Sequence, residues 1–425
     1  MKLNYKRTIL VGFAFFLISA FWQAYDTIVP LILTNKFNME QTYSGIIMSL
    51  DNIFAVVLLP IFGALSDKTV SKFGKRTPYI TVGTVFASLF LILLGFTPKL
   101  ILFVFVLLGC LLSMATFRSP AVALMPDVTV KPLRSKGNAV INLMGTAGGM
   151  IVLGLGIVFK TSTAGKTDFS VYLIAVSVLM LGALVAFLLT VKEPLWSSEA
   201  EAENAKLDAE SPVAEQPKAF GKLTRSELTS LILILASVAL WYIGYNAITS
   251  KYSVYATEVL KVPYTVTLLV AQGAAIVSYI PVGMVASKIG RKKTILAGVL
   301  MLTVAFAAAS FIKEGTTPIA MYLLFCLAGI GWATINVNSF PMVVELAKGG
   351  DVGKYTGFYY TASMTAQIVT PILSGFLVDK IGWHVFFPYA AIFVGFAFVT
   401  MFFVQHGDSK PEAQGALESL AGADD

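Results

Sequence analysis

The chain has 425 residues, of which 56% are hydrophobic and 13% are charged. This charged share is about half the usual one, so it leaves too little charge to solvate the surface of a soluble protein of this length. Disordered, collagen-like and small disulfide-rich classes are also excluded. The class that remains is an integral membrane protein. The 31 basic residues outnumber the 24 acidic ones, but their placement favours membrane orientation over a nucleic-acid partner.

Twelve apolar runs are long enough to cross a bilayer core, which needs roughly 20 residues per helix. The runs are continuous and not alternating, which excludes the strands of a membrane β-barrel. The first run is too long for a signal peptide and lacks a small-residue cleavage site, so we expect it to be retained. The predicted spans are 8–33, 43–65, 78–97, 100–125, 138–159, 169–191, 228–249, 264–286, 294–312, 318–343, 356–378 and 384–404.

The basic residues are distributed unevenly between the two sides of the membrane. An even number of spans places both termini on one side. The loops on that side carry 22 basic residues, and the opposite loops carry eight. Cytoplasmic loops hold the excess of Lys and Arg, so both termini of this multi-pass chain are predicted to lie in the cytoplasm, with the plasma membrane as its location.

The composition changes between the sixth and seventh spans. Residues 193–217 hold seven acids, one lysine and three prolines. A regulatory or docking segment is one interpretation, but a flexible, solvated linker between two six-helix halves is favoured. The predicted organisation is an N-terminal bundle at 1–191, an acidic cytoplasmic linker at 192–227, a C-terminal bundle at 228–404 and a disordered cytoplasmic tail at 405–425.

The two halves echo each other at an offset of 216–220 residues. A single match would mean nothing, but matches in register at the same places relative to the spans indicate two parallel six-helix repeats. Halves of this kind pack around a midplane cavity and open it alternately to each side. The matched pairs are Trp22 and Trp241, Gly63 and Gly283, Gly74 and Gly290, Pro98 and Pro318, Asp127 and Glu345, Arg134 and Lys354, and Gly137 and Gly357.

The sharpest motif is the loop between spans two and three, residues 63–78, which reads GALSDKTVSKFGKRTP. Its first glycine lets another helix approach closely. The bases of the loop fix orientation, and they can also latch onto acids at neighbouring helix ends. The glycine–acid–base spacing favours the latch over a role in topology alone. The predicted latch residues are Gly63, Asp67, Lys68, Lys75, Arg76, Asp127, Arg134 and Glu345.

This loop resembles the hallmark loop of the major facilitator superfamily, and the resemblance covers the whole chain through its twelve spans, its repeat and its long acidic middle loop. It implies an all-α membrane protein with twelve transmembrane helices in two six-helix pseudo-repeats. In the second copy of the loop, residues 283–292, Ser287 stands where the family often has aspartate. The second latch is therefore expected to be weaker than the first.

The longer stretch 60–80, with Pro120 and the Ala123-Leu124-x-x-Asp127 pattern, is similar to the sucrose:proton symporters and to the glycoside–pentoside–hexuronide:cation symporters. This resemblance implies a carbohydrate substrate, either a glucoside or a disaccharide. The glycoside branch carries cation-binding acids just before the proline of span two, where this chain has Ala55 and Leu59. The departure favours protons as the coupling ion, with sodium left open.

Three ionisable side chains lie well inside predicted spans: Asp26, Asp51 and Arg118. An unpaired charge is costly there, so each is a functional candidate. Burial in an apolar cavity favours the protonated form of a carboxyl group, so Asp26 or Asp51 is predicted to carry the coupled proton and Arg118 to respond to its charge. The alternative is that Asp51 and Asn52 make an ordinary polar contact between helices.

Sugars are recognised by hydrogen-bonding groups together with flat aromatic surfaces. Helical spacing places several aromatic and polar residues on shared faces, as for Trp332 with Asn336. For each single residue, ordinary packing or the aromatic belt at the membrane surface is the alternative. The candidate substrate-binding residues are Trp22, Gln23, Asn52, Asn142, Trp241, Tyr245, Asn246, Gln272, Trp332, Asn336, Tyr360 and Gln367.

Catalytic and metal-binding motifs are absent from the sequence, which has no Walker-type loop and no cysteine–histidine cluster. Cys110 and Cys326 both lie in apolar runs and resemble small hydrophobic residues. The sequence predicts neither an enzyme nor a cofactor or metal, but a monomeric, proton-coupled carbohydrate transporter in the lipid bilayer. Two alternatives stay open: a transporter of the same fold for an organic acid or amphipathic drug, and a transport-inactive receptor that signals through the middle loop.

Overall fold

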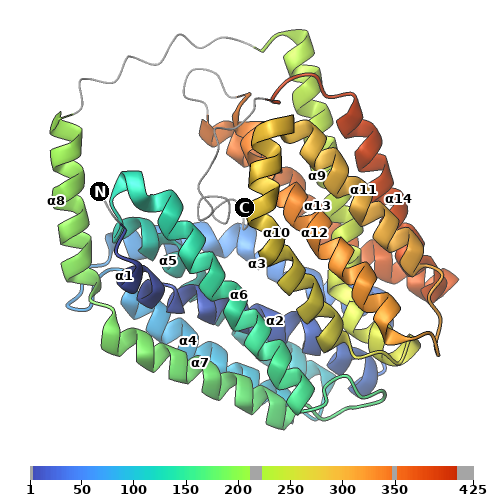
Figure 1. Cartoon of the computed structure of the whole chain (residues 1–425). Helices are drawn as coiled ribbons and strands as arrows, with labels where there is room; N and C mark the ends of the chain where they lie inside the picture. The colour runs from blue at the N-terminus through green and yellow to red at the C-terminus, as the bar shows by residue number, and fades with distance from the viewer. Residues whose placement is uncertain (1–2, 211–222, 347–351, 409–425) are drawn as a thin grey trace. The chain divides into compact units, whose positions relative to one another are not determined.

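The computed structural model describes residues 3–210, 223–346 and 352–408, and its regular elements within these ranges are all helical (Figure 1). Among the described residues, four short helical turns extend or precede the longer helices: Ile32–Lys36, Lys131–Leu133, Tyr255–Val259 and Trp383–Val385. The α-helices are α1 (Tyr5–Val11), α2 (Phe13–Leu31), α3 (Gln41–Lys68), α4 (Thr77–Phe96), α5 (Leu100–Asp127), α6 (Arg134–Val158), α7 (Ser170–Thr190), α8 (Glu193–Glu210), α9 (Arg225–Val254), α10 (Tyr264–Ile289), α11 (Arg291–Ala309), α12 (Pro318–Val344), α13 (Val352–Ile381) and α14 (Phe386–Phe402).

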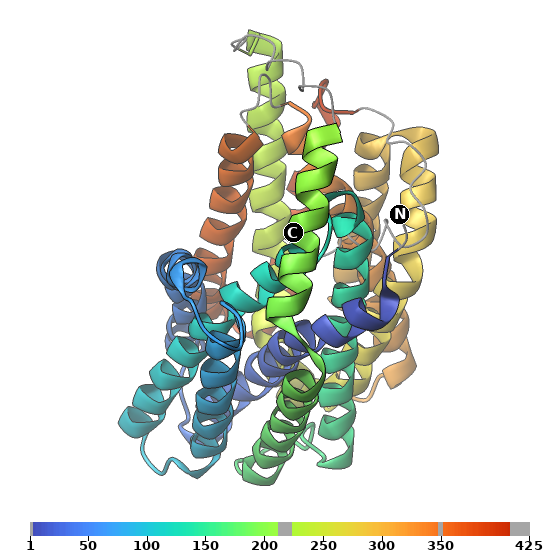
Figure 2. The same cartoon turned by 90° about the vertical axis from the view of Figure 1, so that its left-hand side faces the viewer.

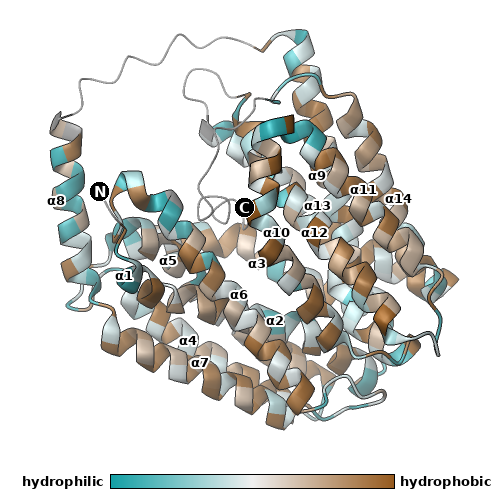
Figure 3. Ribbon diagram, in the orientation of Figure 1, coloured by the Kyte–Doolittle hydropathy of each residue, from teal (hydrophilic) through white to brown (hydrophobic). Residues whose placement is uncertain are grey.

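Among the described residues, twelve helices are long and apolar enough to cross a membrane, which confirms the predicted fold class. The first span runs over Tyr5–Lys36, because α1, α2 and a π-helical turn at Ile32–Lys36 follow one another. These helices are predominantly brown in the hydropathy view, whereas α8 is largely teal (Figure 3). The seventh span extends past its predicted end at residue 249, because Lys251 is buried in the fold and α9 continues through it.

The internal contacts divide the chain into two compact units. Unit 1 comprises Met1–Asn38 and Leu50–Val213, and unit 2 comprises Met39–Ser49 and Ala214–Asp425. The division therefore falls inside α3, whose first turns pack with the C-terminal half of the chain. Residues 211–222 of the predicted linker and 409–425 of the predicted tail lie outside the described residues.

Glycines allow close helix packing in unit 1, where α2 lies against α6 and α4 lies against α5 and α7. A Cβ atom added to Gly148 of α6 would lie 2.6 Å from the main-chain oxygen of Phe16 in α2. One added to Gly83 of α4 would lie 2.6 Å from Cβ of Phe117 in α5. Neither position has room for a larger side chain, because real Cβ atoms do not approach other atoms so closely.

Unit 2 is built in the same way. In it, α12 packs against α10 and α11, and α9 packs against α13 and α14 (Figure 1). A Cβ atom added to Gly329 of α12 would lie 2.2 Å from the main-chain oxygen of Ala271 in α10. This close packing fixes the aromatic face of unit 2 that is described below.

Residues 193–210 of the predicted linker form helix α8, which follows α7 after a short connection (Figure 2). The helix forms because one side of it is anchored to unit 1: Trp196 is buried, and Arg7 pairs with Glu199. The guanidinium of Arg7 also lies 5.2 Å from the centre of the Trp196 ring. Further along, the main-chain N–H of Lys131 donates to Asn204 at 2.8 Å.

Candidate functional site

Three charged residues from three helices gather in unit 1. Asp26 lies on α2, Asp51 on α3 and Arg118 on α5, and each is half-buried. The charges of Asp51 and Arg118 both act on Asp26, and that of Arg118 also acts on Asp51. The guanidinium of Arg118 lies 5.5 Å from the centre of the Trp22 ring, within the range of a cation–π interaction. The structure thus brings these predicted residues into one cluster.

The polar contact between Asp51 and Asn52 lies within α3 and not between helices, because the two residues are neighbours on it. One carboxylate oxygen of Asp51 accepts the main-chain N–H of Asn52 at 2.6 Å and its side-chain amide at 2.8 Å. The contact orients the carboxylate of Asp51 without joining α3 to another helix.

Tyr25 belongs to the same cluster, although it was not among the predicted residues. Its side chain is fully buried, and the charges of Asp51 and Asp26 act on it. Its ring meets that of Trp22 edge-on, with 5.3 Å between the ring centres. Its hydroxyl oxygen and the Trp22 Nε1 atom are both buried without a hydrogen-bond partner among the described residues. Buried polar atoms without partners are rare, so these two are candidates for contact with water or solute.

An aromatic face lies in unit 2. Trp332 of α12 stacks on Tyr245 of α9, with 3.6 Å between the ring centres and 3° between the planes. Tyr242 of α9 contacts Trp332 edge-on at 5.4 Å and 88°. Trp332 and Tyr245 are both among the candidate substrate-binding residues, and the structure brings them together. The candidate Trp241 is fully buried, and Tyr242, which was not a candidate, lies beside the Trp332 indole.

Hydroxyl groups connect the three helices behind this face. The Tyr359 hydroxyl of α13 lies 2.9 Å from Oγ of Ser339 in α12. Tyr359 also hydrogen-bonds to Tyr242 of α9. The candidate Tyr360 lies beside Tyr359, with 5.7 Å between the rings. Neither Ser339 nor Tyr359 was predicted, because neither has a sequence signal beyond its ordinary place in an apolar helix.

The remaining substrate candidates are divided between the units. In unit 1, Gln23 is half-buried on α2, next to Trp22. Asn142 of α6 is 4% exposed.

In unit 2, Asn246 donates to the main-chain oxygen of Tyr242 at 2.9 Å, so part of its side chain is engaged by its own helix. Asn336 is 7% exposed, one turn beyond Trp332. Gln272 of α10 and Gln367 of α13 are half-buried.

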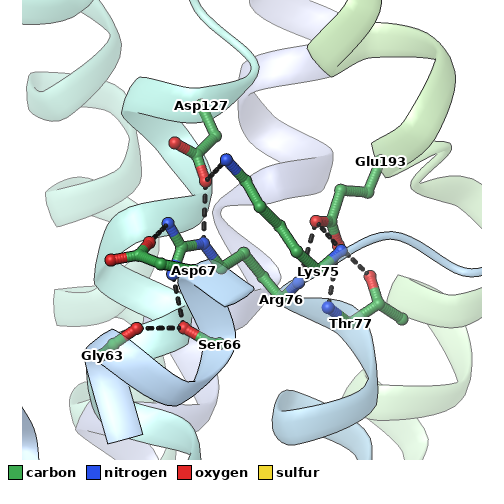
Figure 4. A network of polar contacts seen from close by, with 8 residues as sticks. All are labelled: Gly63, Ser66, Asp67, Lys75, Arg76, Thr77, Asp127 and Glu193. Atoms are coloured by element: carbon green, nitrogen blue, oxygen red, sulfur yellow. Dashed lines mark hydrogen bonds and ion pairs between the residues drawn. The ribbon is translucent and has the colours of Figure 1, made fainter. Parts of the chain in front are cut away.

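The predicted latch centres on Arg76, whose side chain is 5% exposed (Figure 4). Its Nε donates to Asp127 at 2.7 Å, and its two terminal nitrogens donate to Asp67 and to Ser66. Nζ of Lys75 lies 3.5 Å from the same oxygen of Asp127. Burial alone would lower the pKa of Arg76, but hydrogen bonds and charges from Asp127 and Asp67 outweigh it and raise the pKa.

Other predicted latch residues lie around this centre. At Gly63, an added Cβ atom would lie 2.8 Å from Oγ of Ser119 in α5, so glycine permits this approach. Lys68 is exposed. Nε of Arg134 donates to the main-chain oxygen of Thr129 at 3.3 Å.

Glu193 completes the latch, although it is more than a hundred residues away in the chain and was predicted to lie in the solvated linker. It is 1% exposed and accepts the main-chain N–H groups of Lys75, Arg76 and Thr77 at 2.8, 2.8 and 2.7 Å. The hydroxyl of Thr77 donates to it as well, at 2.7 Å (Figure 4). Free N–H groups at the start of a helix favour a carboxylate, and Glu193 fills this role for α4.

Unit 2 repeats this arrangement. Nη1 of Arg291 donates to Glu345 at 2.6 Å, as Arg76 does to Asp127. Asp408 accepts the main-chain N–H of Lys292 at 2.7 Å and caps α11 as Glu193 caps α4. Asp408 belongs to the predicted tail, so its first residues take part in the fold. Ser287 is bonded within its own helix, to the main-chain oxygen of Met284.

Comparison with known proteins identifies the class. Residues 10–382 match the family of MFS/sugar transport proteins, and the chain belongs to this family. It is therefore a multi-pass membrane transporter for a small-molecule solute, and not an enzyme. No group of three or more His, Cys, Asp or Glu side chains is placed to hold a metal in the part of the chain that the structure describes.

Three relatives show the breadth of this resemblance. An uncharacterized MFS-type transporter of Methanocaldococcus jannaschii is 22% identical over 91% of this chain and 92% of its own length. A chloramphenicol resistance protein of Acinetobacter baumannii is 30% identical over 36% of this chain and 37% of its own. A sucrose transport protein of Arabidopsis thaliana is 29% identical over 33% of this chain and 26% of its own.

Solved structures show the same fold at low identity. The inward-open xylose transporter XylE from E. coli is 13% identical, with a TM-score of 0.67 over 98% of this chain and 99% of that one. A peptide transporter is 14% identical, with a TM-score of 0.69 over 94% and 93%.

Proposed function

We propose that the protein is a secondary active transporter that moves a carbohydrate, either a glucoside or a disaccharide, in symport with protons. The observation that carries this proposal is the contrast between the two units. In unit 1, two carboxylates and a guanidinium lie close enough to interact electrostatically. In unit 2, a stacked aromatic pair lies among neutral amides and hydroxyls. The first set suits an ion and the second an uncharged solute with a flat apolar face.

The aromatic face supports the choice of a sugar. Pyranose rings have an apolar C–H face and a rim of hydroxyls, so they need a flat ring and hydrogen-bonding side chains beside it. Trp332 and Tyr245 supply the ring, with Asn336 one turn along α12. A sucrose transport protein and the xylose transporter are among the similar proteins, which agrees with this chemistry.

The charged cluster supports proton coupling. Two carboxylates near one cation carry one net negative charge, and a single proton neutralises the set. Asp26 or Asp51 accepts that proton, and Arg118 then stays paired with the other carboxylate. A neutral cluster crosses the low-dielectric interior during alternating access at lower cost than a charged one. Protonation in this way would license the conformational change.

The same proposal includes the orientation and the assembly. With the basic loops on the cytoplasmic side, Arg76, Arg291 and both termini face the cytoplasm of a plasma-membrane protein. A single chain contains both units and so suffices for transport.

A transporter of a neutral, amphipathic drug is the second candidate, and the chloramphenicol resistance relative favours it. An aromatic pair would stack on an aromatic drug as readily as on a sugar. We therefore test binding with purified protein and intrinsic tryptophan fluorescence, using sucrose, an aryl glucoside and chloramphenicol as ligands.

The sugar proposal predicts saturable quenching by sucrose that is lost in Trp332→Ala. Trp383→Phe is the matched control, because this indole packs against Tyr255 and Phe386, away from the Trp332 stack, and its loss should leave sucrose binding unchanged. Binding of chloramphenicol but of neither sugar would replace the proposal with the second candidate.

A further inference from the structure

The first turns of α3 form a joint with α13 inside unit 2. Two glycines make it tight. A Cβ atom added to Gly45 would lie 2.0 Å from the main-chain oxygen of Pro371, and one added to Gly375 would lie 2.2 Å from that of Gln41. The helix continues into unit 1 beyond residue 49. Any displacement of these turns from α13 must therefore bend α3 or open the joint.

Asp379, near the end of α13, holds the N–H groups of this joint. Its two oxygens accept the main-chain N–H of Gln41 at 2.8 Å and that of Thr42 at 2.7 Å. The Thr42 hydroxyl donates to the same carboxylate at 2.5 Å. These are N–H groups of the first turn of α3, which have no acceptor within their own helix. The cap therefore comes from another span and is lost when the turn moves away.

Lys251 of α9 holds the carbonyl side of the same turn. Its Nζ donates to the main-chain oxygen of Gln41 at 2.8 Å, and the residue is 1% exposed. The charge of Asp379 acts on it. A buried ammonium group is costly without partners, so lifting Gln41 from the joint requires another acceptor for this charge.

We propose that Lys251 and Asp379 form an exchange latch on the first turn of α3. With the turn seated, the backbone of Gln41 and Thr42 satisfies both charges. When the turn leaves, the exposed carboxylate of Asp379 pairs with the buried ammonium of Lys251, so neither state leaves that ammonium uncompensated. The latch gives the joint two stable states. The proposal rests on the transporter class but not on the identity of the solute.

The seated state is measured with a cysteine at Ser44, which is 1% exposed within the joint. The background is Cys110→Ala with Cys326→Ala, and the readout is the rate of modification of Ser44→Cys by a soluble maleimide in nanodiscs. Thr42→Val removes one hydrogen bond to Asp379 and should raise the rate about fivefold, since such a bond is worth about 1 kcal/mol. Lys380→Glu reverses a neighbouring exposed charge on α13 and should leave the rate unchanged.

The exchange is tested by swapping the charges. In the double variant Lys251→Asp with Asp379→Lys, the two side chains can still pair with each other. However, the new carboxylate faces the main-chain oxygen of Gln41, and the new ammonium faces the N–H groups of α3. The double variant should therefore label at least tenfold faster than the parent and still melt above either single reversal. Labelling at the parent rate would contradict the claim that Lys251 and Asp379 hold the first turn of α3 against α13. A melting temperature no higher than those of the single reversals would overturn the pairing.

A second route does not depend on the folding of the reversals. Gly375→Ala wedges Gln41 away without changing a charge, so labelling of Ser44→Cys should be fast. In that background, Asp379→Asn should lower the melting temperature by several degrees, because Lys251 loses its carboxylate, whereas Lys380→Gln should not. Equal melting temperatures for the two variants would contradict the exchange. Because none of these measurements uses a solute, their failure is distinct from failure of sugar transport.

Discussion

Arg76 donates to Asp127 in unit 1, at 2.7 Å, just as Arg291 donates to Glu345 in unit 2, at 2.6 Å. The two contacts are 215 residues apart at the arginine, and each follows a glycine with positive φ, 102° at Gly74 and 94° at Gly290. The internal repeat is thus a repeat of a charged contact as well as of helices. The copies differ in burial, since the side chain of Arg76 is 5% exposed and that of Arg291 is 16% exposed.

This difference predicts unequal effects of removing the two arginines. Arg76→Ala should lower the stability of the protein by about 2 kcal/mol, because it strands two carboxylates, of which Asp67 is largely exposed and screened. Arg291→Ala should cost less, since the side chain of Arg291 is 16% exposed and its ion pair with Glu345 is better screened by water. Thermal unfolding of both variants in the same detergent measures the difference. Equal shifts in melting temperature would contradict the greater strength of the first latch.

Glu193 is predicted to stabilise the first latch more than its position in an acidic segment would indicate. Glu193→Gln turns an amide towards main-chain N–H groups that need an acceptor, and it should cost about 1–3 kcal/mol. Glu203→Gln, on the same helix but exposed and paired with Lys206, is the matched control and should be neutral. Thermal unfolding distinguishes them, and an equal, small effect of both would exclude the capping role.

Tyr359 should affect solute binding without contacting the solute. Its hydroxyl holds Tyr242, whose ring edge fixes the plane of Trp332. Tyr359→Phe keeps the ring and should weaken sugar binding about threefold to tenfold through a less ordered indole, with little change in melting temperature. Tyr322→Phe, on the same helix as Trp332 but ten residues earlier, serves as control. Tryptophan quenching titrations provide the dissociation constants, and an unchanged value for Tyr359→Phe would argue against this role.

The loop before α7 should add stability that depends on pH. Hydrogen bonds from the Ser170 side chain and main chain lower the pKa of Asp168 below its ordinary 3.8, and Lys36 and Lys166 act in the same direction. A lowered folded pKa gives stability that is present above pH 3.8 and is lost as the pH falls through the folded value. Asp168→Asn should therefore lower the melting temperature by a few degrees at pH 7, less so near pH 3. A constant difference across this range would contradict the assignment.

Hydropathy alone predicted the number and the approximate limits of the spans, because each must bury about 20 residues in lipid. The charge pattern and the internal repeat identified Arg76, Asp127 and Glu345 as latch candidates. All three lie at the ends of apolar runs, where charged residues are easily recognised in the sequence. Trp332 and Tyr245 were proposed as candidates because aromatic and polar residues stand out in an apolar helix. The stacking of Trp332 on Tyr245 was not predicted. Four-residue spacing identifies residues on the same face of one helix, but it does not show which other helix packs against that face.

The features that were missed depend on contacts between distant segments. Glu193 and Asp408 cap helices more than a hundred residues earlier in the chain, so nothing local distinguishes them from solvated acids. Lys251 was assigned to a loop because an ammonium group ordinarily ends an apolar run. It lies inside α9 because the carbonyl of Gln41 and the charge of Asp379 compensate it. Likewise, the sequence predicts that α3 belongs wholly to the N-terminal bundle. Only its packing in the structure assigns its first turns to unit 2.

The central proposal is coupled movement of sugar and protons, and it is tested most directly in proteoliposomes loaded with a pH-sensitive dye. An inward proton gradient should drive accumulation of a disaccharide, and addition of the sugar without a gradient should acidify the lumen. Asp26→Asn or Asp51→Asn, whichever carries the proton, should abolish acidification while sugar binding persists. Sugar uptake that neither responds to the gradient nor moves protons in the parent, or full coupling in both amide variants, would contradict the account.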